Sequence, residues 1–218
     1  MKTDLVLQKE VEDAILREPL LGATAISITT IGGIVRLSGN ISSYAKKMET
    51  ENIVKKVIGV QSIISDIEVL IRGWDQKNDK DITAEVLNAF RWNWNTLNDT
   101  INVEVENGWV TLSGTLEWNY QKEAAKIAVG NLIGVKGITN NIIITANRNI
   151  EVNKLTIERA LWSHVDLDVT YIEVLVSGSN VTLKGNAESS YQKELAGRIA
   201  WKAPGVLKVD NELLVQYE

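Results

Sequence analysis

The sequence predicts an α+β protein made of three tandem αββαβ domains, each with two helices packed on one face of a three-stranded sheet. Three observations support this fold class. One strand motif is written three times, as VRLSG, VTLSG and VTLKG. The occurrences are spaced by about 70 residues, a length that suits a small domain better than a solenoid repeat. Around each motif the apolar pattern alternates between the helical and the strand period.

The three copies align without a gap when Leu37, Leu112 and Leu183 are placed in register. Residues on both sides of this leucine then match in type in every copy. Examples are Ala14, Ala89 and Ala160; Ile26, Ile101 and Ile172; and Lys47, Lys122 and Lys193. The register predicts three domains, which we call domains 1, 2 and 3, at residues 1–72, 79–146 and 149–218.

The middle copy shows the first three elements most clearly. DITAEVLNAF predicts a helix, with Asp81 as its N-cap and an apolar stripe at helical spacing. INVEVENG alternates apolar and polar residues, which predicts a strand with one solvated face. Asn107-Gly108 is a strong hairpin signal, so WVTLSG is predicted to return as the second strand.

The same copy continues with a second helix and a third strand. NYQKEAAKIAVGNLIG predicts the helix, with Gly134 as the residue that follows its C-terminus. VKGITNNIIIT predicts the strand. The linker after the first copy is polar and is expected to be loose, whereas the short linker between the second and third copies is expected to let those two domains pack together.

Composition excludes several classes of function. The chain has no cysteine and a single histidine, His164, so it offers no disulfide framework, no thiolate nucleophile and no ordinary zinc ligand set. The nearby Asp166 and Asp168 lack the spacing and glycine of an EF-hand loop. The formal charge of −5 argues against a nucleic-acid binder. We therefore expect no catalytic residues, no metal, no cofactor and no nucleic-acid partner.

The sequence also predicts where the protein resides. No apolar run approaches the ~18–20 residues that span a bilayer, and charges occupy the N-terminal segment where a secretion signal needs an apolar stretch. We expect a cytoplasmic protein that is at most peripheral to a membrane. A periplasmic location would require that a leader peptide had been removed.

The repeated motifs resemble the BON domain, a family named after bacterial osmotically inducible and nodulation proteins. The resemblance rests on the G-x-V-x-L-x-G hairpin, the YQKE segment, and the GV and I-x-N motifs before the last strand, and it covers nearly the whole chain. The first copy departs from it at Ala45, which replaces Tyr120 and Tyr191, and at Ser65, which replaces an asparagine. The resemblance implies the αββαβ fold, no catalytic motif, and roles in osmotic or envelope stress, phospholipid or small-ligand binding and transport-associated assemblies.

Six glycines recur at two positions of the repeat. They are Gly39, Gly114 and Gly185 at the end of the second strand, and Gly59, Gly134 and Gly205 after the second helix. We expect them to be structural, because glycine permits positive φ and close contact between strand and helix. The alternative is that backbone amides beside the strand glycines bind an anion such as a phosphate headgroup.

Tryptophan distinguishes the middle copy from its sisters. Trp92, Trp94 and Trp118 occupy positions that are not aromatic in the other copies. The first two follow Phe90 and Arg91 where the first helix ends, and the third lies where the second helix begins. These residues predict either a surface that docks on a membrane, partner or ligand, or packing within and between domains.

Four lysines lie on the second helix of the first copy, at Lys46, Lys47, Lys55 and Lys56. Two glutamates alternate with them, so the pattern predicts a solvated face with local ion pairs. Attraction to anionic lipid is the alternative.

These observations favour a non-enzymatic, stress- or transport-associated module that binds a phospholipid membrane surface or a partner protein through the Trp-rich side of domain 2. The alternatives are a self-assembling structural scaffold, that is, a homo-oligomer, and a small-ion or small-ligand sensor. The binding hypothesis assigns Trp92, Trp94, Trp118, Phe90 and Arg91 to the contact surface.

Overall fold

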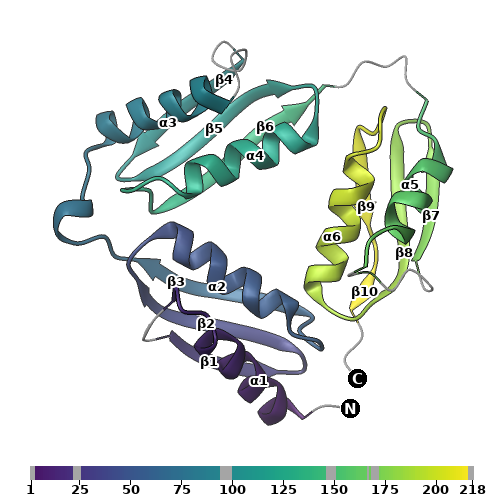
Figure 1. The fold of residues 1–218 in the computed structure, drawn as a ribbon, viewed down its shortest axis with the longest axis horizontal. Helices are drawn as coiled ribbons and strands as arrows, with labels where there is room; N and C mark the ends of the chain where they lie inside the picture. The colour runs from purple at the N-terminus through teal and green to yellow at the C-terminus, as the bar shows by residue number, and fades with distance from the viewer. Residues whose placement is uncertain are drawn as a thin grey trace.

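The αββαβ order occurs three times in the computed structural model, so the predicted fold class is confirmed (Figure 1). The structure describes residues 3–21, 26–93, 100–145, 151–165, 167 and 172–215, and at residues 74, 92 and 93 it describes the backbone alone. In each sheet the second strand is central, antiparallel to the first strand and parallel to the third. Figure 1 shows both helices of each domain on one face of its sheet.

Domain 1 contains two helices and three strands that alternate as predicted. They are α1 (Asp4–Leu16), β1 (Ile26–Ile31), β2 (Ile34–Ile41), α2 (Tyr44–Lys56) and β3 (Ser62–Val69). Hydroxyl groups cap both helices, because the side chain of Thr3 accepts the N–H of Val6 and that of Ser43 accepts the N–H of Lys46. A short 3-10 turn, η1 (Gly73–Asp75), leads into domain 2.

Domain 2 shows two element ends that differ from the prediction. Its elements are α3 (Asp79–Asn93), β4 (Ile101–Glu106), β5 (Trp109–Leu116), α4 (Asn119–Gly130) and β6 (Gly137–Ile144). Asp81 is not the N-cap of α3, because the side chain of Asn78 accepts the N–H of Asp81 at 2.9 Å and the helix already includes Asp79. Gly134 does not follow α4 directly, since the helix ends at Gly130 and positive φ is reached only in the later turn.

The predicted hairpin turn of domain 2 is confirmed. Asn107 and Gly108 have φ values of 53° and 82°, the left-handed pair that a type I′ turn requires. The carboxylate of Asp79 accepts the backbone N–H of both turn residues, at 2.8 Å each. The first turn of α3 therefore fixes the position of the hairpin.

Domain 3 repeats the order with one difference in its last strand. Its elements are α5 (Lys154–Trp162), β7 (Ile172–Ser177), β8 (Asn180–Ala187), α6 (Ser190–Trp201), β9 (Lys208–Asn211) and β10 (Leu214–Val215). Both β9 and β10 run parallel to β8, so two short strands occupy the place of one.

Each domain has its own apolar core between its sheet and its two helices. The central strand buries alternate side chains in all three cases, which agrees with the period-2 pattern of the sequence. These side chains are Val35, Leu37 and Ile41; Val110, Leu112 and Leu116; and Val181, Leu183 and Ala187.

The repeated strand glycine lies inside the central strand, not at its end. Gly39, Gly114 and Gly185 have φ values of 136°, 131° and 120°, and each strand continues beyond its glycine. A Cβ atom at Gly114 would overlap the backbone carbonyl oxygen of Thr100. A side chain at this position therefore meets both steric overlap and an unfavourable φ.

The three domains surround a common centre, with α2, α4 and α6 on the inner side and α1, α3 and α5 farther out (Figure 1). Helix α2 packs against both α4 and α6, so domain 1 contacts each of the other domains. The short linker led us to expect domain 3 to pack on domain 2, but its hydrogen-bonded docking is on domain 1. The reason is that a linker limits distance without selecting the complementary surface.

Candidate functional site

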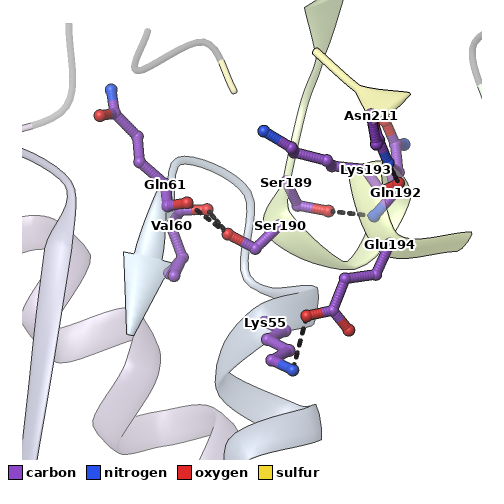
Figure 2. A network of polar contacts seen from close by, with 9 residues as sticks. All are labelled: Lys55, Val60, Gln61, Ser189, Ser190, Gln192, Lys193, Glu194 and Asn211. Carbon is purple, nitrogen blue, oxygen red and sulfur yellow. Dashed lines mark hydrogen bonds and ion pairs between the residues drawn. The ribbon is translucent and has the colours of Figure 1, made fainter. Parts of the chain in front are cut away.

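Hydrogen bonds join the N-terminal end of α6 in domain 3 to the loop after α2 in domain 1. The hydroxyl of Ser190 shares its single proton between the carbonyl oxygens of Val60 and Gln61, at 2.9 and 2.6 Å (Figure 2). The N–H of Ser190 also donates to Val60, and the N–H of Gly59 donates to the carbonyl of Glu188. The first N–H groups of a helix lack partners within the helix. The Val60 carbonyl of domain 1 therefore accepts an N–H of α6 that would otherwise have no hydrogen-bond partner in that helix.

Two lysines of α2 take part in this junction. Lys55 forms an ion pair with Glu194 of α6 at 2.7 Å, and the ammonium of Lys56 lies 5.4 Å from the centre of the Tyr191 ring. Lys47 donates instead to a backbone carbonyl of its own domain. The prediction of a solvated face with local ion pairs was therefore wrong for Lys47, Lys55 and Lys56. A pattern local to one helix contains no information about the acidic and aromatic partners on α6.

A second junction joins domain 2 to domain 1. Tyr44, at the start of α2, packs on the core of domain 2, and a Cβ atom at Gly130 of α4 would overlap the end of the Met48 side chain. Burial raises the pKa of the Tyr44 hydroxyl, and the charge of Glu51 raises it further. In the repeat register Tyr44 is equivalent to Ser190, and Gly130 is equivalent to Lys55. Both junctions therefore use the same two ends of the second helix.

The equivalent N-terminal end of α4 shows a departure from the repeat. Ser43 and Ser189 directly precede α2 and α6, and each hydroxyl accepts a backbone N–H of its helix, at 3.3 and 3.2 Å. Trp118 takes their place before α4, where an indole has no acceptor for this purpose. The side chain of Gln121 partly compensates by accepting the N–H of Trp118 at 3.2 Å.

Two large side chains of α4, the helix that follows Trp118, are open to solvent. Tyr120, the equivalent of the docking residue Tyr191, is 53% exposed, and Ile127, two turns farther along the same face, is 55% exposed. Trp118 itself is half-buried. We call Trp118, Tyr120, Glu123 and Ile127 the α4 surface.

The structure separates the other residues assigned to the binding hypothesis. Phe90 is fully buried in the core of domain 2, so it supports α3 and cannot belong to an exposed surface. Arg91 is exposed in the last turn of α3. Trp92 belongs to α3, but its side chain lies outside the described residues, as does the whole of Trp94.

Two observations on the described residues concern metal ions and membrane spans. Within the described ranges, no three histidine, aspartate or glutamate side chains are placed to hold a metal ion. None of the helices in the described part is long and apolar enough to cross a bilayer.

The fold and its junctions define a class of protein, a tandem array of small α+β domains that dock through their second helices. The particular family follows from comparison with known proteins. The BON domain model matches residues 3–70, 78–146 and 153–217, so the chain belongs to the BON domain family.

One curated relative and two solved structures are similar to this chain. Osmotically-inducible protein Y of Escherichia coli (strain K12) is 26% identical over 145 residues, which are 64% of this chain and 71% of the relative. The family and this relative together support a stress-related BON module. Two structures of CdsD, a structural protein of the type III secretion system of Chlamydia trachomatis, are 16% identical. They cover 98% and 99% of this chain. The matches include 93% and 99% of their own chains, at a TM-score of 0.25 in both cases.

Proposed function

We propose that the chain is a non-enzymatic, stress-related binding module that docks on phospholipid surfaces through the α4 surface of domain 2. The observation that carries the proposal is Trp118, which stands where both sister domains have a helix-capping serine. Loss of such a cap costs about 1 kcal/mol. A large aromatic at this point, beside the exposed Tyr120 and Ile127, therefore favours a role outside the helix itself.

The side chains of this surface suit the boundary between water and lipid. Tryptophan and tyrosine have an apolar body and a polar edge, and they concentrate at the headgroup level of membranes. Domain 2 carries more acidic than basic residues, so attraction to anionic lipid does not drive the contact. Arg91, Trp92 and Trp94 remain proposed contributors, whereas Phe90 acts only by supporting α3.

Co-sedimentation with phosphatidylcholine vesicles tests this function. The double variant Tyr120→Ala/Ile127→Ala is expected to bind about tenfold more weakly, because it removes apolar area from the contact. Ile143→Ala is the matched control, since Ile143 is 63% exposed on β6, outside the α4 surface. Addition of anionic lipid is expected to leave binding unchanged or to weaken it. Equal sedimentation of wild type and double variant, or no sedimentation of either, would rule the proposal out.

Self-assembly is the second candidate, and one observation favours it. Lys56 contacts Tyr191 at the junction of domains 1 and 3, and the equivalent pair is Lys202 of domain 3 with the exposed Tyr120 of domain 2. The ammonium of Lys202 makes no hydrogen bond, ion pair or ring contact with another described residue. In this scaffold, Lys202 of one copy docks on Tyr120 of a second copy.

Light scattering over a range of protein concentrations separates the two candidates. The scaffold predicts a mass that rises with concentration and that falls back to the monomer in Lys202→Ala. The membrane function predicts that Lys202→Ala binds vesicles as well as wild type does. A monomer at every concentration would exclude the scaffold and leave the membrane function standing.

A further inference from the structure

A cavity of about 560 Å³ lies between domains 1 and 3, and Ser190 is one of its lining residues. Figure 2 shows three others, Lys55, Lys193 and Glu194, around this contact. Residues of α2 and β3 line it from domain 1, and residues of α6 and β9 line it from domain 3. The side chains on which the argument depends are Glu51, Lys55, Ser65, Lys193 and Glu194. The cavity exists because two domains meet, so no single BON domain contains it.

Lys193 departs from its equivalents in the other two domains. Lys47 donates to the carbonyl of Ile67 at 2.8 Å, and Lys122 donates to the carbonyl of Ile142 at 2.7 Å. Each of these lysines ties its second helix to the third strand. The ammonium of Lys193 makes no hydrogen bond or ion pair with the described residues and lines the cavity instead.

Ser65 departs from the repeat at the same cavity. Its equivalents, Asn140 and Asn211, each donate to a helix carbonyl and accept the backbone N–H of the second residue after them. Ser65 makes neither bond, and its hydroxyl is buried with no hydrogen-bond partner among the described residues. A buried hydroxyl without a partner is costly, so a ligand that bonds to it would recover free energy.

The charges that remain in the cavity have opposite signs. Lys55 and Glu194 form an ion pair with each other. This leaves Lys193 as a cation without a counter-ion and Glu51 as a carboxylate that makes no ion pair within the described part of the chain. Unpaired charges of both signs match a molecule that carries both an anionic and an ammonium group.

We propose that this cavity binds a small zwitterion, either a free α-amino acid or an ethanolamine phosphate headgroup. Lys193 binds its anionic group and Glu51 binds its ammonium group, and rotation of the Ser65 side chain turns its buried hydroxyl toward the ligand. Because the ligand contacts both domains, its binding strengthens the junction between domains 1 and 3. This site is separate from the α4 surface and does not depend on the proposed membrane function.

Calorimetric titration of the full chain with L-serine and with O-phosphoethanolamine tests the proposal, with acetate and methylammonium as single-charge controls. Saturable binding of at least one zwitterion at millimolar concentration is expected, with each control about tenfold weaker or worse. The zwitterion that binds more tightly identifies the source. Acetate binding as tightly as the zwitterions, or no saturable heat with any compound, would overturn the proposal.

Three variants assign the roles. Lys193→Met is expected to weaken zwitterion binding at least tenfold, and Glu51→Gln is expected to remove the preference for a zwitterion over acetate. Ser65→Asn restores the residue of the other domains, fills the cavity and is expected to abolish binding while the chain stays folded. Lys184→Met is the control, because Lys184 is exposed on β8 and is not among the residues that line the cavity. Unchanged affinity in Lys193→Met would contradict the assignment even if Ser65→Asn failed to fold.

Discussion

Ser190→Ala tests whether domains 1 and 3 are joined in solution. The substitution removes the one hydroxyl proton that is shared between the carbonyls of Val60 and Gln61, and it leaves the α6 backbone unchanged. At about 1 kcal/mol for this shared hydrogen bond, the junction loses about 1 kcal/mol. If the junction opens as a unit, amides that it protects should exchange their hydrogens about fivefold faster. The reporting amides are those of residues 59 and 190, which donate across the junction.

Hydrogen exchange of the full chain, resolved to single amides by NMR, measures this effect. Ser43→Ala is the control, because it removes the hydroxyl that caps α2 and leaves the amides of residues 59 and 190 in place. It should accelerate exchange in the first turn of α2 and leave the junction amides unchanged. If the amide exchange rates of residues 59 and 190 are the same in Ser190→Ala as in wild type, the junction does not protect these amides. That result would refute the docking of domain 3 on domain 1.

Three further predictions concern stability. The pKa of Tyr44 is raised in the folded chain, so at a pH just above the ordinary phenol pKa the unfolded chain releases a proton that the folded chain keeps, and the free energy of unfolding falls as pH rises. Denaturant unfolding of Tyr44→Phe should show a smaller fall in this free energy at alkaline pH. A fall identical to that of wild type would contradict this. Gly114→Ala should lower the free energy of unfolding by about 3 kcal/mol. Gly32→Ala should lower it by about 1 kcal/mol, because φ at Gly32 is 55° but no atom lies near an added Cβ. Equal losses would show that steric overlap at Gly114 is unimportant. Asp79→Ala removes the acceptor of two backbone N–H groups in the hairpin turn, so it should lower the free energy of unfolding by about 1–2 kcal/mol in thermal unfolding. Asp79→Asn should lower it less. No loss in Asp79→Ala would show that Asp79 does not stabilise the hairpin.

The order of elements could be predicted because local physics determines it. Alternation of apolar residues set the inward face of each central strand, and Asn107-Gly108 specified the turn that joins two strands. Helix ends were less accurate, because Asn78 was an equally good cap three residues before Asp81. Gly134 matched the pattern of a helix-ending residue, yet α4 ends one turn earlier.

The candidate sites were only partly visible in the sequence. Trp118 could be found, since it interrupts a register in which the other copies have a serine. The pairing of Lys55 with Glu194 could not, because residues far apart in the chain become partners only once two domains dock. Ser65 was visible as a departure from the repeat, but the cavity that this residue lines belongs to the arrangement of domains 1 and 3.

The most direct test of the central claim is to observe the α4 surface while the protein is bound to vesicles. The chain has no cysteine, so Glu123→Cys provides a single position for a spin label on that surface, and Leu214→Cys provides an exposed control on β10. Accessibility to a water-soluble relaxation agent is measured with and without phosphatidylcholine vesicles. We predict that the label at position 123 becomes protected while the label at position 214 does not. Protection at position 214 alone, or none at position 123 when the protein co-sediments, would contradict the account.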